Sequence, residues 1–296
     1  MILDAFDAVT PAFEVAGPSE PATPLVVCSP HSGRHYPPGF VRSARLDPLA
    51  LRRSEDAYVD RLIAGAEAAG ATCLTANFPR AWLDVNREPY ELDPRMFRGR
   101  LPSFANTRSL RVASGLGAIP RVVADSQEIY SERMGVDEGM ARIEGVHRPF
   151  HATLRGLVDR ARRRFGLCVL VDCHSMPSIS CASPEGGRRP DFVIGDRYGQ
   201  SSAPVWVGAV EAALRGRGRE TSRNRPYAGG YITERYGEPS AGVHAVQVEV
   251  NRALYMDEAT VTPHGRIAAV TADFDAIWSA LRALMDCGGE ALVAAE

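Results

Sequence analysis

The sequence predicts an α/β protein built on a largely parallel or mixed sheet that is covered on both faces. Two observations lead to this fold class. Apolar runs of strand length alternate along the chain with segments of helical periodicity, which is the pattern of such sheets. The chain has 296 residues and is 45% hydrophobic, so it can bury a full core. We therefore expect one domain over residues 24–296, preceded by an irregular arm at residues 1–23 that is rich in Ala, Pro and Ser.

The expected elements follow from the spacing of apolar residues. Six short apolar runs predict strands at residues 25–28, 71–76, 81–85, 168–171, 192–194 and 245–250. Four segments with helical periodicity predict helices at residues 48–69, 137–165, 203–215 and 265–285. We expect Pro149 to kink or divide the second helix. Residues 88–121 are rich in Pro, Gly, Arg and Ser and predict a long excursion, of the kind that often forms a lid or a binding loop.

Composition excludes several classes of function. The formal net charge of -2 and the charged fraction of 24% leave no basic field that would attract a nucleic-acid backbone. No lysine occurs in the chain, which excludes a lysine Schiff base and the lysine of a phosphate-binding loop. We therefore expect no nucleic-acid partner.

The cysteines and the hydropathy indicate a cytoplasmic protein. The six cysteines are scattered, without the paired short spacing of structural zinc sites, and no secretory leader precedes them. No apolar stretch approaches the length that spans a bilayer. We expect reduced thiols, a soluble cytoplasmic protein and no membrane partner. The oligomeric state stays open.

Polar residues that follow buried strands mark the candidate site, because ligands of open α/β sheets gather beyond the carboxyl ends of the strands. His31 follows the first strand, His174 follows the run at residues 168–171, and Glu249 lies near the end of the last strand. Two histidines and a carboxylate are typical of a zinc site that leaves its fourth position to water. Glu55 and Asp56, expected in the first turns of the helix after His31, are the candidates for the acidic ligand.

Three further features stand out. Arg80 and Arg87 bracket an apolar run, with Asn86 beside Arg87, and arginine forks match carboxylates in two-point geometry. His147 and His151 have the i, i+4 spacing of metal-binding helices, but we favour hydrogen bonding in a packed polar patch, because Pro149 lies between them. Residues 227–233 (YAGGYIT) predict a glycine turn that enters a strand and permits close approach of a ligand.

Taken together, these motifs resemble the N-formylglutamate amidohydrolase family. The resemblance covers residues 25 to 260 and depends on seven segments. They are residues 29–33 (SPHSG), 55–56 (ED), Arg80 with residues 84–87 (DVNR), 172–175 (DCHS), 230–233 (GYIT), 244–249 (HAVQVE) and 255–257 (YMD). The resemblance implies a three-layer α/β/α fold around a mixed sheet, like that of zinc carboxypeptidases and aspartoacylase. The chain departs from the His-x-x-Glu pair of those relatives, since Arg34 stands three residues after His31.

The resemblance also implies roles and a reaction. A divalent metal, zinc in the first place, would be held by His31, Asp56 and His174, with Glu55 as the alternative to Asp56. Glu249 would act as general base and then acid, and Arg80 would stabilise the developing oxyanion. Asn86 and Arg87 would bind the α-carboxylate, and Gly230 and Tyr231 would complete the substrate site. The reaction would be hydrolysis of N-formyl-L-glutamate to formate and L-glutamate, as in histidine degradation.

Alternatives remain open at this point. The second carboxylate of the substrate has four candidate partners, Arg34, Arg225, Arg235 and Arg252. A carboxypeptidase-like metallohydrolase of another N-acyl amino acid or a small peptide would have the same metal site. A non-catalytic amino-acid-binding protein would keep the fold without turnover. A cysteine hydrolase using Cys173 is disfavoured, because adjacent residues of an extended segment, such as Cys173 and His174, point in opposite directions.

Overall fold

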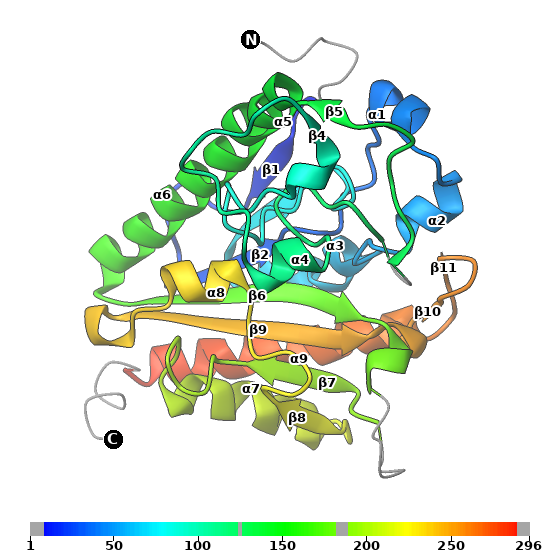
Figure 1. The fold of residues 1–296 in the computed structure, drawn as a ribbon. Coiled ribbons are helices and arrows are strands. Elements are labelled where there is room, and N and C mark those ends of the chain that lie inside the picture. The colour runs from blue at the N-terminus through cyan, green and yellow to red at the C-terminus, as the bar shows by residue number, and fades with distance from the viewer. Residues whose placement is uncertain (1–8, 124–125, 182–188, 289–296) are drawn as a thin grey trace. The chain divides into compact units, whose positions relative to one another are not determined.

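The computed structural model describes residues 9–123, 126–181 and 189–288 (Figure 1). The chain divides into two compact units, each assembled from several stretches of sequence. The first unit comprises Met1–Glu14, Pro30–Ala57 and Thr75–Leu154. The second comprises Val15–Ser29, Tyr58–Leu74 and Arg155–Glu296. The single domain that we expected from residue 24 onward stays a prediction.

A seven-stranded sheet runs through the second unit, and the division between the units passes through its strands β1 and β3. The strand order is β1-β3-β2-β6-β9-β7-β8. The strands are β1 Phe13–Ala16, β2 Leu25–Ser29, β3 Thr72–Ala76, β6 Cys168–Met176, β7 Phe192–Gly195, β8 Thr221–Arg223 and β9 Val243–Asn251. β2, β6 and β9 pair in parallel, whereas β7 is antiparallel to β9 and parallel to β8. The expected mixed sheet is confirmed.

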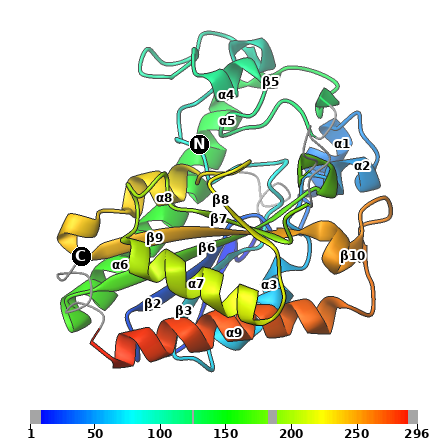
Figure 2. The same cartoon turned by 90° about the horizontal axis from the view of Figure 1, so that it is seen from below.

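Helices cover the centre of this sheet on both faces. Every residue of β6 and of β9 is buried, which requires cover on each side. Helices α7 (Pro204–Gly216) and α9 (Ile267–Asp286) pack against each other on one face, and α8 (Tyr231–Tyr236) packs on β9 from the other (Figures 1 and 2). The α/β/α layering implied by the family resemblance is therefore present in the second unit.

Five of the six predicted strands are present, and the exception is residues 81–85. These residues form turns and irregular backbone in the first unit, although all five are buried. A short apolar run does not distinguish a strand from a buried loop, so the apolar pattern alone was misleading here. β6 and β9 are longer than predicted, because both continue through polar residues that are themselves buried.

The arm before the first predicted strand is not wholly irregular. Residues 13–16 form β1, an edge strand of the sheet, so the expectation is wrong there. Its half-exposed residues, with one edge unpaired, give a weaker apolar signal than a central strand. Residues 1–8 of the predicted arm lie outside the described residues.

The helix predicted at residues 48–69 is broken into short pieces. The chain forms α2 (Pro48–Arg52), α3 (Val59–Leu62) and a 3-10 turn at Ala64–Ala66. Between α2 and α3 the Asp56 N–H donates to the His31 carbonyl at 3.0 Å, in place of a helical hydrogen bond. Tyr58 then adopts the left-handed conformation with φ of 66°. Glu55 and Asp56 therefore lie in the break and not in the first turns of a helix.

The other predicted helices are present with one change of geometry. Residues 137–165 form α5 (Val136–Arg142), a π-helical turn at Ile143–His147 and α6 (Arg148–Phe165) without a break at Pro149. Pro149 has no N–H to donate to the carbonyl of residue 145, which lies in the π-helical turn, so the helix continues with a local change in its hydrogen bonding. Residues 231–233, predicted as a strand after the glycine turn, begin α8 instead.

The remaining elements are short. They are α1 Pro38–Ser43, η2 Pro94–Met96, β4 Phe97–Arg98, α4 Leu110–Ala113, β5 Met134–Gly135, η5 Ser178–Cys181, η6 Pro239–Ala241, η7 Arg252–Leu254, β10 Met256–Asp257 and β11 Thr262–Pro263. Only η2, β4 and α4 of these fall within residues 88–121, so the long excursion predicted there is confirmed. Among the described residues, no helix combines the length and the hydropathy needed to cross a membrane.

We expect the buried carboxylate of Asp273 to stabilise the second unit. It is fully buried on α9 and accepts hydrogen bonds from Arg217 Nε at 2.5 Å and Arg219 Nε at 2.7 Å. Asp273→Asn removes the charge that compensates two guanidinium groups, and should lower the free energy of unfolding by about 3 kcal/mol. Urea unfolding at pH 7 measures this change.

The matched control is Asp286→Asn on the same helix. Asp286 also pairs with an arginine, Arg282, at 3.0 Å, but its side chain is 62% exposed. Its loss should change the stability by no more than about 0.5 kcal/mol. Equal losses in the two variants would contradict the role given to burial.

Candidate active site

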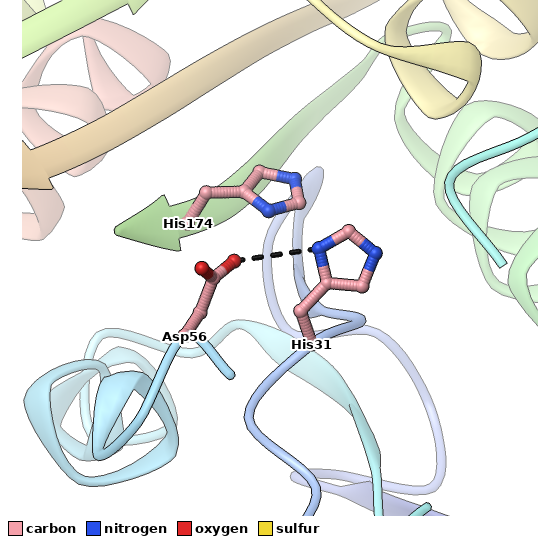
Figure 3. Close-up of side chains that lie close together, drawn as sticks. All are labelled: His31, Asp56 and His174. Carbon is pink, nitrogen blue, oxygen red and sulfur yellow. Dashed lines mark ion pairs between the residues drawn. The ribbon is translucent and has the colours of Figure 1, made fainter. Parts of the chain in front are cut away.

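His31 lies between two carboxylates in the first unit. The chain leaves β2 at Ser29, and His31 follows as a buried residue. Its Nε2 is 2.7 Å from Asp84 Oδ1. Its Nδ1 is 3.4 Å from Asp56 Oδ2, as Figure 3 shows. The ring is thus oriented from one side by Asp84 and presents its other nitrogen toward Asp56.

The backbone around His31 is held by close packing. A Cβ on Gly33 would lie 2.1 Å from the Phe78 carbonyl oxygen, so only glycine fits there. The His35 N–H donates to the Asn77 carbonyl at 2.9 Å. The SPHSG segment therefore requires glycine at this position, because the backbone at residues 77–78 approaches it closely.

Asp84 is the charged centre of this arrangement, a role that we did not assign from the sequence. Burial raises its pKa, but Arg80, Arg87 and His31 outweigh burial and hold it well below its usual range. Arg80 Nε donates to Asp84 Oδ2 at 2.9 Å, and the Asn86 N–H donates to Oδ1 at 2.8 Å. An ionised carboxylate only accepts, so His31 Nε2 carries the proton and donates it.

Of the two candidate acidic ligands, Asp56 is the one beside His31. Glu55 is also buried, but it accepts hydrogen bonds from Tyr36 Oη at 2.6 Å and from Arg52 Nε at 3.2 Å. Neighbouring residues in the break between α2 and α3 thus face different partners.

The residues expected to bind the α-carboxylate sit in the irregular segment after Asp84. Asn86 is buried, and its carbonyl accepts from Arg87 Nη1 at 2.8 Å. Arg87 Nε donates to the Leu116 carbonyl at 2.9 Å. Arg87 is thereby anchored to the excursion at residues 88–121.

In the second unit, His174 and Glu249 lie on one face of the sheet. His174 on β6 is the register partner of Glu249 on β9. Asp172 lies two residues before His174, so its side chain is on the same face, and its Oδ2 is 2.9 Å from His174 Nε2. His174 therefore belongs to a strand, and not to a loop after it as we expected, whereas Glu249 lies within the predicted strand.

Gln247 is a residue that we did not single out from the sequence. Its Nε2 donates to Glu249 Oε1 at 3.0 Å, and its Oε1 accepts from the Gly230 N–H at 2.8 Å. Gly230 therefore orients Gln247 through its backbone, and Tyr231 begins α8 directly after it. Gln247 and Asp172 could have been found from one signal, a polar residue two positions before a candidate on a buried strand.

The candidates for the second substrate carboxylate differ in burial. Arg34, Arg225 and Arg235 are exposed, whereas Arg252 is buried and donates from Nε to Ser175 Oγ at 3.0 Å. The choice among the four stays open.

His31, Asp56 and His174 are buried residues that could hold a metal ion, each with one ligand atom (Figure 3). Two imidazoles and a carboxylate suit zinc, and they also accept iron, cobalt or manganese. The Nε2 atom of each histidine lies beside a buried carboxylate, which is Asp84 for His31 and Asp172 for His174. Histidines that bind metals typically donate their second ring N–H in this way. The donor set therefore fits a divalent metal.

The thiol of Cys173 is poorly suited to act as a nucleophile. Burial, and then the charge of Asp172, raise the pKa of Cys173 well above its usual value, so the thiol stays protonated at neutral pH. On β6 it points to the face opposite His174.

We therefore expect Cys173 to resist alkylation in the folded protein. Iodoacetamide at pH 8 should modify Cys287, which is exposed and serves as the internal control, and should leave Cys173 unmodified. Mass spectrometry of tryptic peptides measures both sites. Equal labelling of the two cysteines under native conditions would contradict this description of the Cys173 environment.

Comparisons with known proteins identify the family of this chain. The model of the N-formylglutamate amidohydrolase family matches residues 23–256. Over 238 residues, the chain is 32% identical to N-formylglutamate deformylase from Pseudomonas aeruginosa, covering 79% of this chain and 83% of that protein. It is 28% identical over the same length to N-formylglutamate deformylase from Pseudomonas putida, covering 79% and 82%.

A solved structure is similar over almost the whole chain. The crystal structure of N-formylglutamate amidohydrolase from Ralstonia eutropha JMP134 superimposes with a TM-score of 0.87 at 34% sequence identity. The match covers 94% of this chain and 99% of that one. With a family model that matches most of its length, this chain belongs to the N-formylglutamate amidohydrolase family.

Proposed function

We propose that the protein is a metal-dependent deformylase that hydrolyses N-formyl-L-glutamate to formate and L-glutamate, as in histidine degradation. The observation that carries the proposal is the pair of buried carboxylate–histidine contacts, Asp84–His31 and Asp172–His174. Membership of the family, and the deformylase names of its Pseudomonas relatives, support the substrate. The cytoplasmic location expected from the sequence stays a prediction.

In this proposal, His31, Asp56 and His174 hold one divalent metal, with zinc the first candidate. Bound there, the metal would lower the pKa of a water molecule and polarise the formyl carbonyl. Asp84 and Asp172 would keep the two imidazoles in the tautomer that leaves Nδ1 to the metal. Asp84 is suited to this role, because its lowered pKa keeps it ionised across the neutral range.

Glu249 is the proposed general base and acid. Its place beside His174 on the same sheet face supports this role. It would take a proton from the attacking water and then deliver it to the nitrogen of the leaving glutamate. The hydrogen bond from Gln247 Nε2 to Oε1 limits the rotation of the carboxylate during both transfers.

Three residues of the first unit are proposed to contact the substrate. Arg80 is 26% exposed and held by Asp84, which leaves a fixed positive charge to stabilise the developing oxyanion. Asn86 and Arg87 would bind the α-carboxylate, the guanidinium supplying charge and the amide a donor. In the second unit, Gly230 and Tyr231 would border the substrate.

The test is formate release from N-formyl-L-glutamate by purified protein. Activity should disappear after chelation and return with Zn²⁺. His174→Ala should abolish both metal binding and turnover, whereas His264→Ala, a control in the same unit, should retain both. A panel of N-formyl-L-aspartate, N-acetyl-L-glutamate and a dipeptide measures specificity. A folded, metal-loaded protein that releases no formate from N-formyl-L-glutamate would refute the proposed substrate.

Glu249→Gln should separate proton transfer from metal binding. The amide keeps the size of the side chain but cannot accept the proton, so kcat should fall by about 10²- to 10⁴-fold. The metal content, measured by mass spectrometry of dialysed protein, should stay at the wild-type value. Loss of metal together with activity would show instead that Glu249 supports the metal site.

Asp84→Asn should weaken metal binding and, like Asp273→Asn, lower the free energy of unfolding, because the charge that compensates Arg80 and Arg87 is lost. Asparagine can still accept from His31 Nε2, but it carries no charge, and loss of such a partner typically lowers metal affinity by about 10- to 100-fold. Competition with a chromophoric chelator measures the Zn²⁺ affinity. Asp137→Asn, an exposed aspartate of the first unit, is the control and should bind Zn²⁺ as the wild type does.

A further inference from the structure

The histidine pair His147 and His151 has no part in the proposed reaction, although both side chains are buried in the first unit. His147 is the last residue of the π-helical turn at Ile143–His147, and His151 lies in the first turn of α6. Their ring centroids are 4.6 Å apart, with an interplanar angle of 32°. Within helices, π turns occur frequently at functional sites, so the position of the pair calls for an explanation.

Both rings donate to the same irregular segment of backbone. His147 Nε2 is 2.9 Å from the Arg87 carbonyl oxygen, and His151 Nε2 is 2.7 Å from the Val85 carbonyl oxygen. A carbonyl oxygen only accepts, so each Nε2 must carry a proton and donate it. The hydrogen-bonding role that the sequence favoured for the pair is confirmed.

The segment that they hold is residues 84–87, which carries Asp84, Asn86 and Arg87. Two of its N–H groups have other partners: the Asp84 N–H donates to the Ala118 carbonyl at 2.8 Å, and the Asn86 N–H donates to Asp84 Oδ1 at 2.8 Å. The segment belongs to no helix or strand, so no ladder of hydrogen bonds satisfies the carbonyls at residues 85 and 87. The two histidines supply those bonds, one on each side of Asn86.

We propose that His147 and His151 are positioning residues that clamp the backbone on either side of Asn86, and so fix Asn86 and Arg87 for the substrate α-carboxylate. The inference rests on the proposed function, which places that carboxylate on these two residues. Asp84 keeps its own anchors, the Ala118 carbonyl and Arg80, when the clamp is removed. The clamp should therefore govern substrate binding and leave the metal site intact.

The test uses His147→Leu and His151→Leu, which remove the donor, and His147→Gln and His151→Gln, whose amide nitrogen can replace Nε2. Each leucine variant should raise KM for N-formyl-L-glutamate about tenfold, the factor that corresponds to one hydrogen bond. The value of kcat should change less than threefold, because binding to the α-carboxylate is the same in the ground and transition states. The Zn²⁺ content should be unchanged, and the glutamine variants should recover most of the wild-type KM.

His244→Leu is the matched control. His244 is also buried and makes one backbone hydrogen bond, accepting from the Ala203 N–H at Nδ1, 3.2 Å away. It lies on β9 on the face opposite Glu249. Its loss should affect stability as the other leucine variants do, but leave KM at the wild-type value.

Several results would overturn the clamp. They are a wild-type KM in both leucine variants, a loss of Zn²⁺ that accompanies the change in KM, or glutamine variants that behave like the leucine variants. If a leucine variant does not fold, His147→Asn and His151→Asn replace it, since asparagine stays polar but is too short to reach the carbonyls.

A measurement independent of turnover separates the clamp from the proposed function. Hydrogen–deuterium exchange of the peptide at residues 84–90 should accelerate in the leucine variants, and stay at the wild-type rate in the glutamine variants and in His244→Leu. Faster exchange without any formate release by the wild type would refute the proposed function and keep the clamp. Unchanged exchange in the leucine variants would refute the clamp, whatever the activity.

Discussion

Around the candidate site, the structure of the first unit depends on the buried carboxylate of Asp84. Its side chain is 2% exposed, and it stays ionised because Arg80, Arg87 and His31 together outweigh the cost of burial. A buried carboxylate of this kind needs donors on every side, and it obtains them from a ring nitrogen, a guanidinium and the Asn86 N–H. The charge therefore sets the orientation of His31 and the path of the chain after residue 84.

The second unit contains a similar carboxylate–histidine pair on a different backbone geometry. Asp172 holds His174 by Nε2, as Asp84 holds His31, but here both residues belong to one strand and share a face through its period of two. The adjacent strand supplies Gln247 and Glu249 in the same way. A sheet holds such side chains more rigidly than a loop, which suits groups that are proposed to bind a metal and move a proton.

The segment at residues 84–87 shows how a site can be precise without regular structure. Side chains supply the hydrogen bonds that a helix or strand would supply through its backbone. Asp84 accepts from the Asn86 N–H, and His147 and His151 donate to the carbonyls of residues 87 and 85. Each of these bonds satisfies a buried group that would otherwise be costly, so the loop is held in one conformation. Buried polar side chains thereby become part of the fold as well as of the proposed site.

The sequence by itself determined the mixed α/β fold, five central strands, and His31, His174 and Glu249 as candidates, because hydrophobic periodicity and motif spacing are local properties. Tertiary structure alone decided that residues 81–85 form no strand and that Glu55 and Asp56 lie in a break of the predicted helix. In the break, the Asp56 N–H bonds the His31 carbonyl, which is 25 residues away in the chain. The roles of Asp84 and of the two clamp histidines were likewise decided by contacts between segments more than 50 residues apart, and no local pattern of residues encodes such contacts.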